Sequence, residues 1–292
     1  MLSRLRRIFD RRFRDSRLIN KIMLIYVSIS VVPILILGAF LVMQERNTMQ
    51  RQRTEYMKNA LEQAAYSVSS DIRVYNNLSD YVAYNQTVSD ALTGSYSSKY
   101  DLYEQYEKTI DPILQSPSYF SPDIEKLKIY VNNGLPSHGE TIAQLSDIKS
   151  TKWYKENKDS LNQSVTWIID SKKHKIRSVR TMPLMEMNNV TALLYIEVKY
   201  NALFDSFDNI CQDGQGLVVL DENGNTVYQK VNGVSAKAVP VSRLMSGESR
   251  YGHFYIESKK IQGLQLTAYM YGKNSFFIWQ NVQLVIVLLV YI

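Results

Sequence analysis

The most constraining feature of the sequence is an uncharged apolar run from Ile22 to Met43. A helix over this run would measure roughly 33 Å, slightly more than the roughly 30 Å hydrocarbon core of a bilayer. Cleaved signal peptides usually have a shorter apolar run of about 7–15 residues. The run therefore predicts a retained transmembrane helix, which tolerates Pro33 in mid-span. A cleaved signal peptide is the alternative, with Gly38 and Ala39 as small residues near a cleavage site.

Positive charge is concentrated directly before this run. Residues 1–21 hold eight Lys and Arg and two Asp, a net charge of 8 − 2 = +6, whereas residues 22–292 hold 26 charges of each sign. Basic flanks favour the cytoplasmic side, so residues 1–21 are predicted to be a cytoplasmic tail, although four basic residues also follow the run. Residues 22–292 carry no net charge, which argues against a nucleic-acid partner. The basic tail can instead contact anionic lipid head groups.

A second uncharged run, residues 276–292, closes the sequence, and Trp279 near its start fits an interfacial aromatic belt. It predicts a truncated second transmembrane helix in the front part of a longer protein. A C-terminal anchor that ends in the membrane is the alternative. Residues 44–275 then form one extracytoplasmic loop between the two spans.

The loop offers little chemistry for catalysis. Cys211 is the single Cys, so no intrachain disulfide is possible, and a buried small hydrophobe is expected there rather than a reactive thiol. The three His have no metal-binding spacing, and no nucleophile motif occurs. We therefore expect no catalytic residues, no metal site and no cofactor in this chain.

Helical patterns open the loop. Apolar residues recur every three or four positions in residues 44–93, without Gly or Pro, which predicts one long helix. A second helical pattern follows Gly94. Pro112 is expected to bend this helix, and Pro117 and Pro122 are expected to end it.

From about residue 126 the pattern changes to β. Strands are predicted at residues 127–131, 164–169, 176–182 and 191–198, and again at 217–220, 226–228, 251–257 and 264–271. Short helices are predicted at 152–158 and 201–207, and hairpin turns at 221–225 and 259–263. The predicted fold class is α+β, with two antiparallel sheets of unequal size on a long N-terminal helix, flanked by two transmembrane helices.

This order of elements resembles the double Cache (PAS-like) sensor regions of bacterial receptors, and more closely the front half of YesM-like sensor histidine kinases. The matching segments are the basic N-terminus, VVPILILGAF, the pair Trp153-Tyr154, YIEVKYNALFDSF and GLVVLDENGNTVYQ. The resemblance implies long helices over 44–116, a membrane-distal sheet domain over 117–207 and a membrane-proximal one over 208–275. It also implies a homodimer in the plasma membrane of a bacterium, with a kinase part that is absent here, so this chain is not expected to be an enzyme.

Similar receptors bind small molecules in the membrane-distal domain, and the resemblance extends to single residues. Trp153 and Tyr154 match an aromatic pair of amino-acid-binding relatives, and Trp167 matches the aromatic on the next strand, with Asp170 just after it. Glu197 stands where an Asp is expected. The Arg positions before the pair hold Lys149, Ser150, Thr151 and Lys152 instead. Lys lacks the bidentate fork of Arg, so Arg177 and Arg180 on a neighbouring strand are the candidate carboxylate-binding groups.

Aromatic walls with a few charged groups are typical of small-ligand pockets, which supports the same residues. The candidate ligand-binding residues are therefore Trp153, Tyr154, Trp167, Asp170, Arg177, Arg180 and Glu197. In the alternative interpretation, the two Trp belong to the core and the cations are solvated.

The predicted function is that of a membrane-anchored sensor for a small polar ligand such as an amino acid, a sugar or a peptide-like molecule. Three alternatives stay open. The same sensor region precedes AraC-type regulators, diguanylate cyclases and chemoreceptors, the loop can instead serve as a binding module for a protein or peptide, and a surface enzyme is the third possibility.

Overall fold

The computed structural model describes residues 18–132, 134, 136–184 and 191–273. The chain divides into two compact units, of which the larger, Met57–Lys273, contains all the strands of the described residues. The predicted span over 276–292 and most of the predicted tail lie outside the described residues. Within those residues, the structure contains no helix whose length and apolar character suffice to cross a membrane.

The longest element is helix α2, Leu18–Ala83. It contains the whole apolar run of residues 22–43, where side chains such as Ile29 and Phe40 are exposed. Helix α3, Gln86–Thr93, follows separately, because the side chain of Asn85 accepts a hydrogen bond from Val88 N–H and starts a new helix. The prediction of one helix up to residue 93 is therefore wrong at this point.

The second helical region contains three segments: α4 (Lys99–Gln105), the π-helix η1 (Tyr106–Ile110) and α5 (Asp111–Phe120). The π-turn ends two residues before Pro112, which has no N–H for the regular helical ladder. The bend expected at Pro112 stays a prediction. Pro117 lies inside α5, contrary to prediction, and the helix ends at Ser121, whose N–H donates to the Pro117 carbonyl.

The first sheet has the strand order β2-β1-β5-β4-β3. Its strands are β1 (Ile124–Val131), β2 (Ile142–Gln144), β3 (Thr166–Asp170), β4 (Lys175–Thr181) and β5 (Ala192–Lys199). The short helices nearby are α6 (Ser146–Lys149), α7 (Lys152–Asn157) and α8 (Tyr200–Asp208). The short strand β2 was not predicted and runs parallel to β1, whereas the other neighbours are antiparallel.

The second sheet has the order β7-β6-β10-β9-β8. Its strands are β6 (Gln215–Asp221), β7 (Thr226–Asn232), β8 (Arg250–Tyr251), β9 (Phe254–Ile261) and β10 (Leu266–Lys273), and helix α9 covers Val241–Met245. Both sheets thus have five strands, so the predicted difference in size is wrong. The last hairpin turns around Gly263, whose φ of 84° favours glycine. Strand β9 pairs with β10 up to Ile261, so it is longer than the predicted strand, which ended at residue 257.

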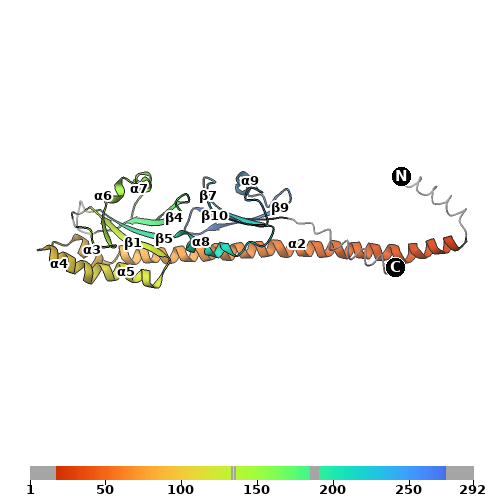
Figure 1. Cartoon of the computed structure of the whole chain (residues 1–292), viewed down its shortest axis with the longest axis horizontal. Coiled ribbons are helices and arrows are strands. Elements are labelled where there is room, and N and C mark those ends of the chain that lie inside the picture. The colour runs from red at the N-terminus through yellow and green to blue at the C-terminus, as the bar shows by residue number, and fades with distance from the viewer. Residues whose placement is uncertain (1–17, 133, 135, 185–190, 274–292) are drawn as a thin grey trace. The chain divides into compact units, whose positions relative to one another are not determined.

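One apolar core connects the helices with both sheets in the larger unit. It includes Leu61 and Ile72 of α2, Ile129 of β1 and Met270 of β10, all nearly inaccessible to solvent. Figure 1 shows the two sheets following one another along α2, with α4 and α5 beside the first sheet. The first sheet therefore has one face packed against the helix and a second face available for a site.

Candidate ligand-binding site

The second face of the first sheet carries a cleft of about 1480 Å³, which extends to the β6–β7 hairpin. Four of the seven predicted site residues line it: Trp153, Asp170, Arg177 and Glu197. Side chains alternate between the faces of a strand, which separates Arg177 from Arg180 on β4 and Asp170 from Trp167 on β3.

Arg177 and Glu197 occupy opposite positions on β4 and β5. Arg177 Nε donates a hydrogen bond of 3.1 Å to the Tyr195 hydroxyl and lies 3.5 Å from Glu197 Oε2. The Tyr195 hydroxyl in turn donates to Glu197 Oε2. Arg177 and Glu197 are only 5% and 2% exposed, so the network is shielded from water and holds both charges in fixed positions.

Two lysines complete the charge distribution around Glu197. Lys175 Nζ donates to Glu197 Oε1 at 2.6 Å, and Lys126 Nζ lies 4.0 Å from the same oxygen. Burial by itself would raise the pKa of the Glu197 carboxyl, but the hydrogen bonds from Lys175 and Tyr195 and the charges of both lysines outweigh it and hold that pKa below its ordinary value. Three cations therefore surround one ionised carboxylate.

Aromatic rings form the wall beside this network. The Arg177 guanidinium lies over the Trp153 ring, and its carbon Cζ is 5.8 Å from the ring centroid. The centroids of the Trp153 and Tyr195 rings are 5.7 Å apart. Tyr130 of β1 packs edge-on against Tyr195 at 5.6 Å. Sequence reasoning missed Tyr195, Tyr130 and the lysines, although Tyr195 lies two residues before Glu197 and must share its face of the strand.

Arg177 has one buried polar atom without a hydrogen-bond partner among the described residues. Among the described residues, no acceptor forms a hydrogen bond with its buried Nη1. Buried polar groups without a partner cost free energy and are rare in native proteins. The atom belongs to a residue that lines the cleft, so an acceptor on a ligand would satisfy it.

Trp167 and Arg180 do not line the cleft, although they were predicted from the sequence to be part of the same site. Both face α2: the Trp167 indole N–H donates to Asn76 Oδ1 at 3.0 Å, and Arg180 donates to Asp80 and to the Tyr84 hydroxyl. Arg180 is three residues from Arg177 on the same strand, and an odd spacing places two side chains on opposite faces.

The two remaining predicted residues lie at the border of the site. Tyr154 packs edge-on against Trp153 at 5.8 Å and does not line the cleft. Asp170 ends β3 and lines the cleft, and its Oδ1 accepts a hydrogen bond of 3.1 Å from Lys173 N–H in the following turn. Tyr154 therefore supports the aromatic wall, and Asp170 shapes the turn.

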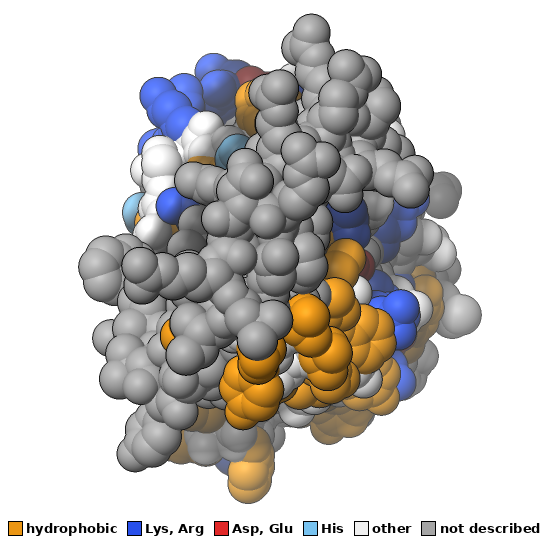
Figure 2. Space-filling view, turned by 90° about the vertical axis from the view of Figure 1, so that its right-hand side faces the viewer, with side chains coloured by type: hydrophobic (Ala, Val, Ile, Leu, Met, Phe, Trp, Pro, Cys, Tyr) orange, Lys and Arg blue, Asp and Glu red, His pale blue; other side chains and the backbone are white. Residues whose placement is uncertain are grey.

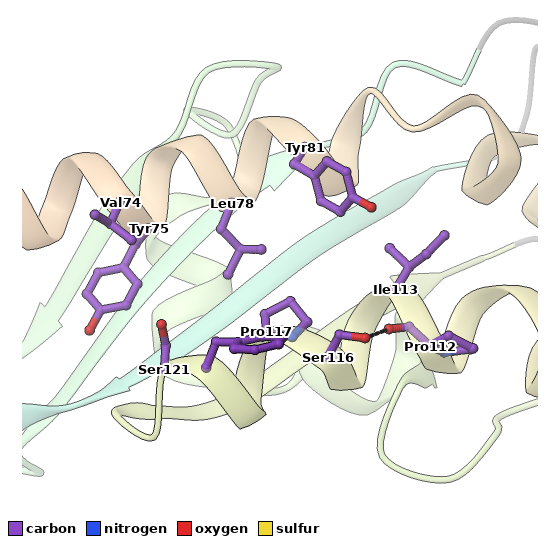
Figure 3. Close-up of a pocket in the computed structure, with 10 residues that line it drawn as sticks. Val74, Tyr75, Leu78, Tyr81, Pro112, Ile113, Ser116, Pro117 and Ser121 are labelled. Atoms are coloured by element: carbon purple, nitrogen blue, oxygen red, sulfur yellow. Dashed lines mark hydrogen bonds between the residues drawn. The ribbon is translucent and has the colours of Figure 1, made fainter.

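A smaller cavity of about 510 Å³ lies between α2 and α5. Figure 3 shows Tyr75, Leu78 and Tyr81 of α2 on one side and Ile113 and neighbouring residues of α5 on the other. Among the described residues, no charged side chain lines this cavity, so it offers a ligand hydroxyl groups but no charge. The cleft around Arg177 is the better candidate site.

The described residues contain no group of three or more His, Cys, Asp or Glu side chains that is placed to hold a metal ion. The groups around Arg177 are suited to binding through hydrogen bonds, charge and aromatic contact.

Two solved structures have a fold similar to that of this chain. The chain superposes with a TM-score of 0.51 on the sensory domain of the Campylobacter jejuni chemoreceptor Tlp3, at 12% identity over 78% of this chain and 96% of that one. It superposes with a TM-score of 0.50 on the extracellular domain of vpHK1S-Z8, a protein named as a histidine kinase, at 14% identity over 75% and 93% of the two chains. No family model and no curated protein sequence matches the chain. The fold is similar to that of these two domains, and identities this low show the fold alone.

Proposed function

We propose that this chain is a membrane-anchored, extracytoplasmic sensor that binds a small polar ligand and forms the input part of a two-component sensor histidine kinase. The observation that carries the proposal is the buried Arg177, with its unpartnered Nη1, against the indole of Trp153 at the wall of a cleft. A concave site with aromatic walls and a few fixed polar groups is suited to a small ligand. The fold of sensory domains supports the same function.

The finer family assignment is also a proposal. The order of segments in the sequence supports a YesM-like double Cache region, with the first sheet as the membrane-distal domain (117–207) and the second as the membrane-proximal domain (208–275). Another output after the sensor region, such as a diguanylate cyclase or a chemoreceptor signalling part, is the alternative. The resemblance further supports a homodimer.

Membrane anchoring is proposed from the uncharged run of residues 22–43. Side chains in this part of α2 are exposed, including Ile22, Ile29, Leu37 and Phe40. Figure 2, which looks from the right-hand side of Figure 1, shows hydrophobic side chains gathered at the surface. Exposed apolar surface of this extent is costly in water and favourable in lipid.

A thermal-shift screen of the full chain in detergent tests the ligand proposal. The panel contains amino acids, hydroxy acids and other organic acids, sugars and short peptides, and we expect at least one compound to raise the melting temperature. Trp153→Ala is expected to abolish this shift, whereas Tyr119→Ala, which alters an exposed side chain on α5, is expected to preserve it. A panel without any stabilising compound, or a shift that survives Trp153→Ala, would contradict the proposal.

Surface labelling of protoplasts tests the proposed topology. Lys172 and Lys173 are exposed in the turn after β3, so an amine-reactive reagent that does not cross membranes is expected to modify them on intact protoplasts. Modification only after lysis would place the sheets in the cytosol and contradict an extracytoplasmic sensor.

A further inference from the structure

The balance of charge in the cleft points to the chemical class of its ligand. The groups nearest the aromatic wall are three cations, Arg177, Lys175 and Lys126, and one carboxylate, Glu197, which gives a net charge of 3 − 1 = +2. Over the whole cleft lining, six Lys and Arg face four Asp and Glu, again 6 − 4 = +2. A positive site attracts anions and disfavours ligands with a net positive charge.

Glu197 is poorly placed to receive the ammonium group of a ligand. Its Oε1 accepts from Lys175, its Oε2 accepts from Tyr195, and the residue is 2% exposed. A ligand ammonium that reached Glu197 would lie beside two positive charges, Lys175 and Arg177. Two other carboxylates that line the cleft, Asp170 and Asp221, each accept a backbone N–H hydrogen bond within their own turn.

Arg177 offers the complementary group. Its Nε is bonded to the Tyr195 hydroxyl, and its buried Nη1 has no acceptor among the described residues. A carboxylate oxygen of a ligand would accept a charge-assisted hydrogen bond from Nη1, which is stronger than a neutral hydrogen bond. The Trp153 indole lies over the same guanidinium and supplies an apolar surface for the body of the ligand.

We propose that the cleft binds an organic carboxylate that carries no ammonium group, such as a hydroxy acid, an oxo acid or a dicarboxylate. The inference rests on the proposed ligand-binding function and narrows it. The carboxylate bonds to Arg177 Nη1, the ligand body packs on Trp153, and Glu197 holds Arg177 and Lys175 in place without contacting the ligand. Because Nη1 is shielded in this structure, a neighbouring side chain has to be displaced when the ligand enters.

Isosteric pairs of hydroxy acids and amino acids test this selectivity. The pairs L-lactate and L-alanine, L-malate and L-aspartate, and L-phenyllactate and L-phenylalanine differ at one α substituent, a hydroxyl against an ammonium. Calorimetric titration of the full chain in detergent is expected to show that at least one hydroxy acid binds at least tenfold more tightly than its amino acid. Tryptophan emission is expected to change on binding, and to stay constant in Trp153→Phe.

Variants separate charge recognition from folding. Arg177→Lys is expected to weaken hydroxy-acid binding at least tenfold, and Arg243→Lys in the second sheet domain is expected to leave it unchanged. Lys126→Gln alters a half-exposed side chain and is expected to fold normally. It should weaken binding of the carboxylate about two- to fivefold, whereas it would strengthen binding of a cationic group.

The possible outcomes distinguish this inference from the proposed function. Equal or tighter binding of the amino acid, or tighter binding by Lys126→Gln, overturns the inference and leaves the sensor function standing. Binding of only a sugar or a peptide has the same consequence. Failure of every compound, including those of the wider panel, overturns both.

Discussion

Arg177 and Glu197 face each other across β4 and β5, with Arg177 Nε 3.5 Å from Glu197 Oε2 at a position where neither side chain is open to water. A buried ion pair of this kind stabilises a protein only when further hydrogen bonds satisfy its atoms. Tyr195 and Lys175 supply those bonds for Glu197. The stability of the network therefore depends on the ionised state of the carboxylate.

The first prediction concerns pH. The pKa of Glu197 lies below its ordinary value of 4.5, so the unfolded chain binds the proton more tightly than the native state. The stabilisation is complete above the ordinary pKa and disappears as the pH falls through the lower, native-state pKa. Glu197→Gln should lower the free energy of unfolding by about 2 kcal/mol at pH 7, and the difference from wild type should shrink below about pH 4.5.

Thermal unfolding of the full chain in detergent between pH 7 and pH 3 measures this difference. Glu248→Gln, which alters a more exposed carboxylate paired with Arg243, is the matched control and should have little effect on stability at any pH. A Glu197→Gln difference that stays constant down to pH 3 would contradict the role of the ionised carboxylate.

The second prediction concerns the contact between β4 and α2. Arg180 is 3% exposed and donates to Asp80, whose side chain is 57% exposed. Asp80→Asn leaves the buried guanidinium without its counter-charge and should cost about 1–3 kcal/mol of unfolding free energy. Asp90→Asn on α3 is the control, because Asp90 is exposed and bonds only with Gln86 of its own helix among the contacts described. Equal stabilities of the two variants in thermal unfolding would show that the Arg180 contact is dispensable.

The third prediction concerns the β9–β10 turn. Gly263 has a φ of 84°, and a Cβ there would lie 2.7 Å from Ile72 Cγ2 of α2. Gly263→Ala therefore combines backbone strain with a steric clash and should destabilise the protein by about 2–4 kcal/mol. Gly247 has a similar φ of 75° and open space around it, so Gly247→Ala isolates the strain at about 1–2 kcal/mol. Similar melting temperatures for the two variants would mean that the turn does not pack on α2.

The fourth prediction concerns the single thiol. Burial raises the pKa of Cys211 to about 11, so little thiolate is present near neutral pH. The folded chain should react with a thiol-specific reagent at pH 8 at least about a hundredfold more slowly than the chain unfolded in urea. Rapid modification of the folded chain would show that Cys211 is an accessible, reactive thiol.

Much of the fold could be predicted from local patterns. The alternation of apolar residues located β1 and β5, and the turn Asp221–Asn225 located the β6–β7 hairpin, because these signals are local. Strand β2 was missed, since three residues without alternation give no signal and the strand is held by pairing with β1. The break before α3 was missed too, although Asn85 is a residue type that favours a helix start.

The candidate site was predicted less completely, for a reason that lies in sheet geometry. Residue type selected Arg177 and Arg180 together, but residues three apart on a strand point to opposite faces. The same rule would have added Tyr195 to Glu197. The charge of the site could not be predicted, because Lys126 comes from β1, which adjoins β5 only after the sheet has formed.

Strand β4 thus has the cleft on one face and helix α2 on the other. Arg177 reaches into the cleft, Arg180 reaches to the helix, and about 10 Å of extended backbone connects them. Strand β4 is paired on both edges, with β3 and with β5, so the backbone between the two arginines is held by its neighbours. In the proposed sensor, three residues of one strand therefore separate the ligand-binding cleft from helix α2.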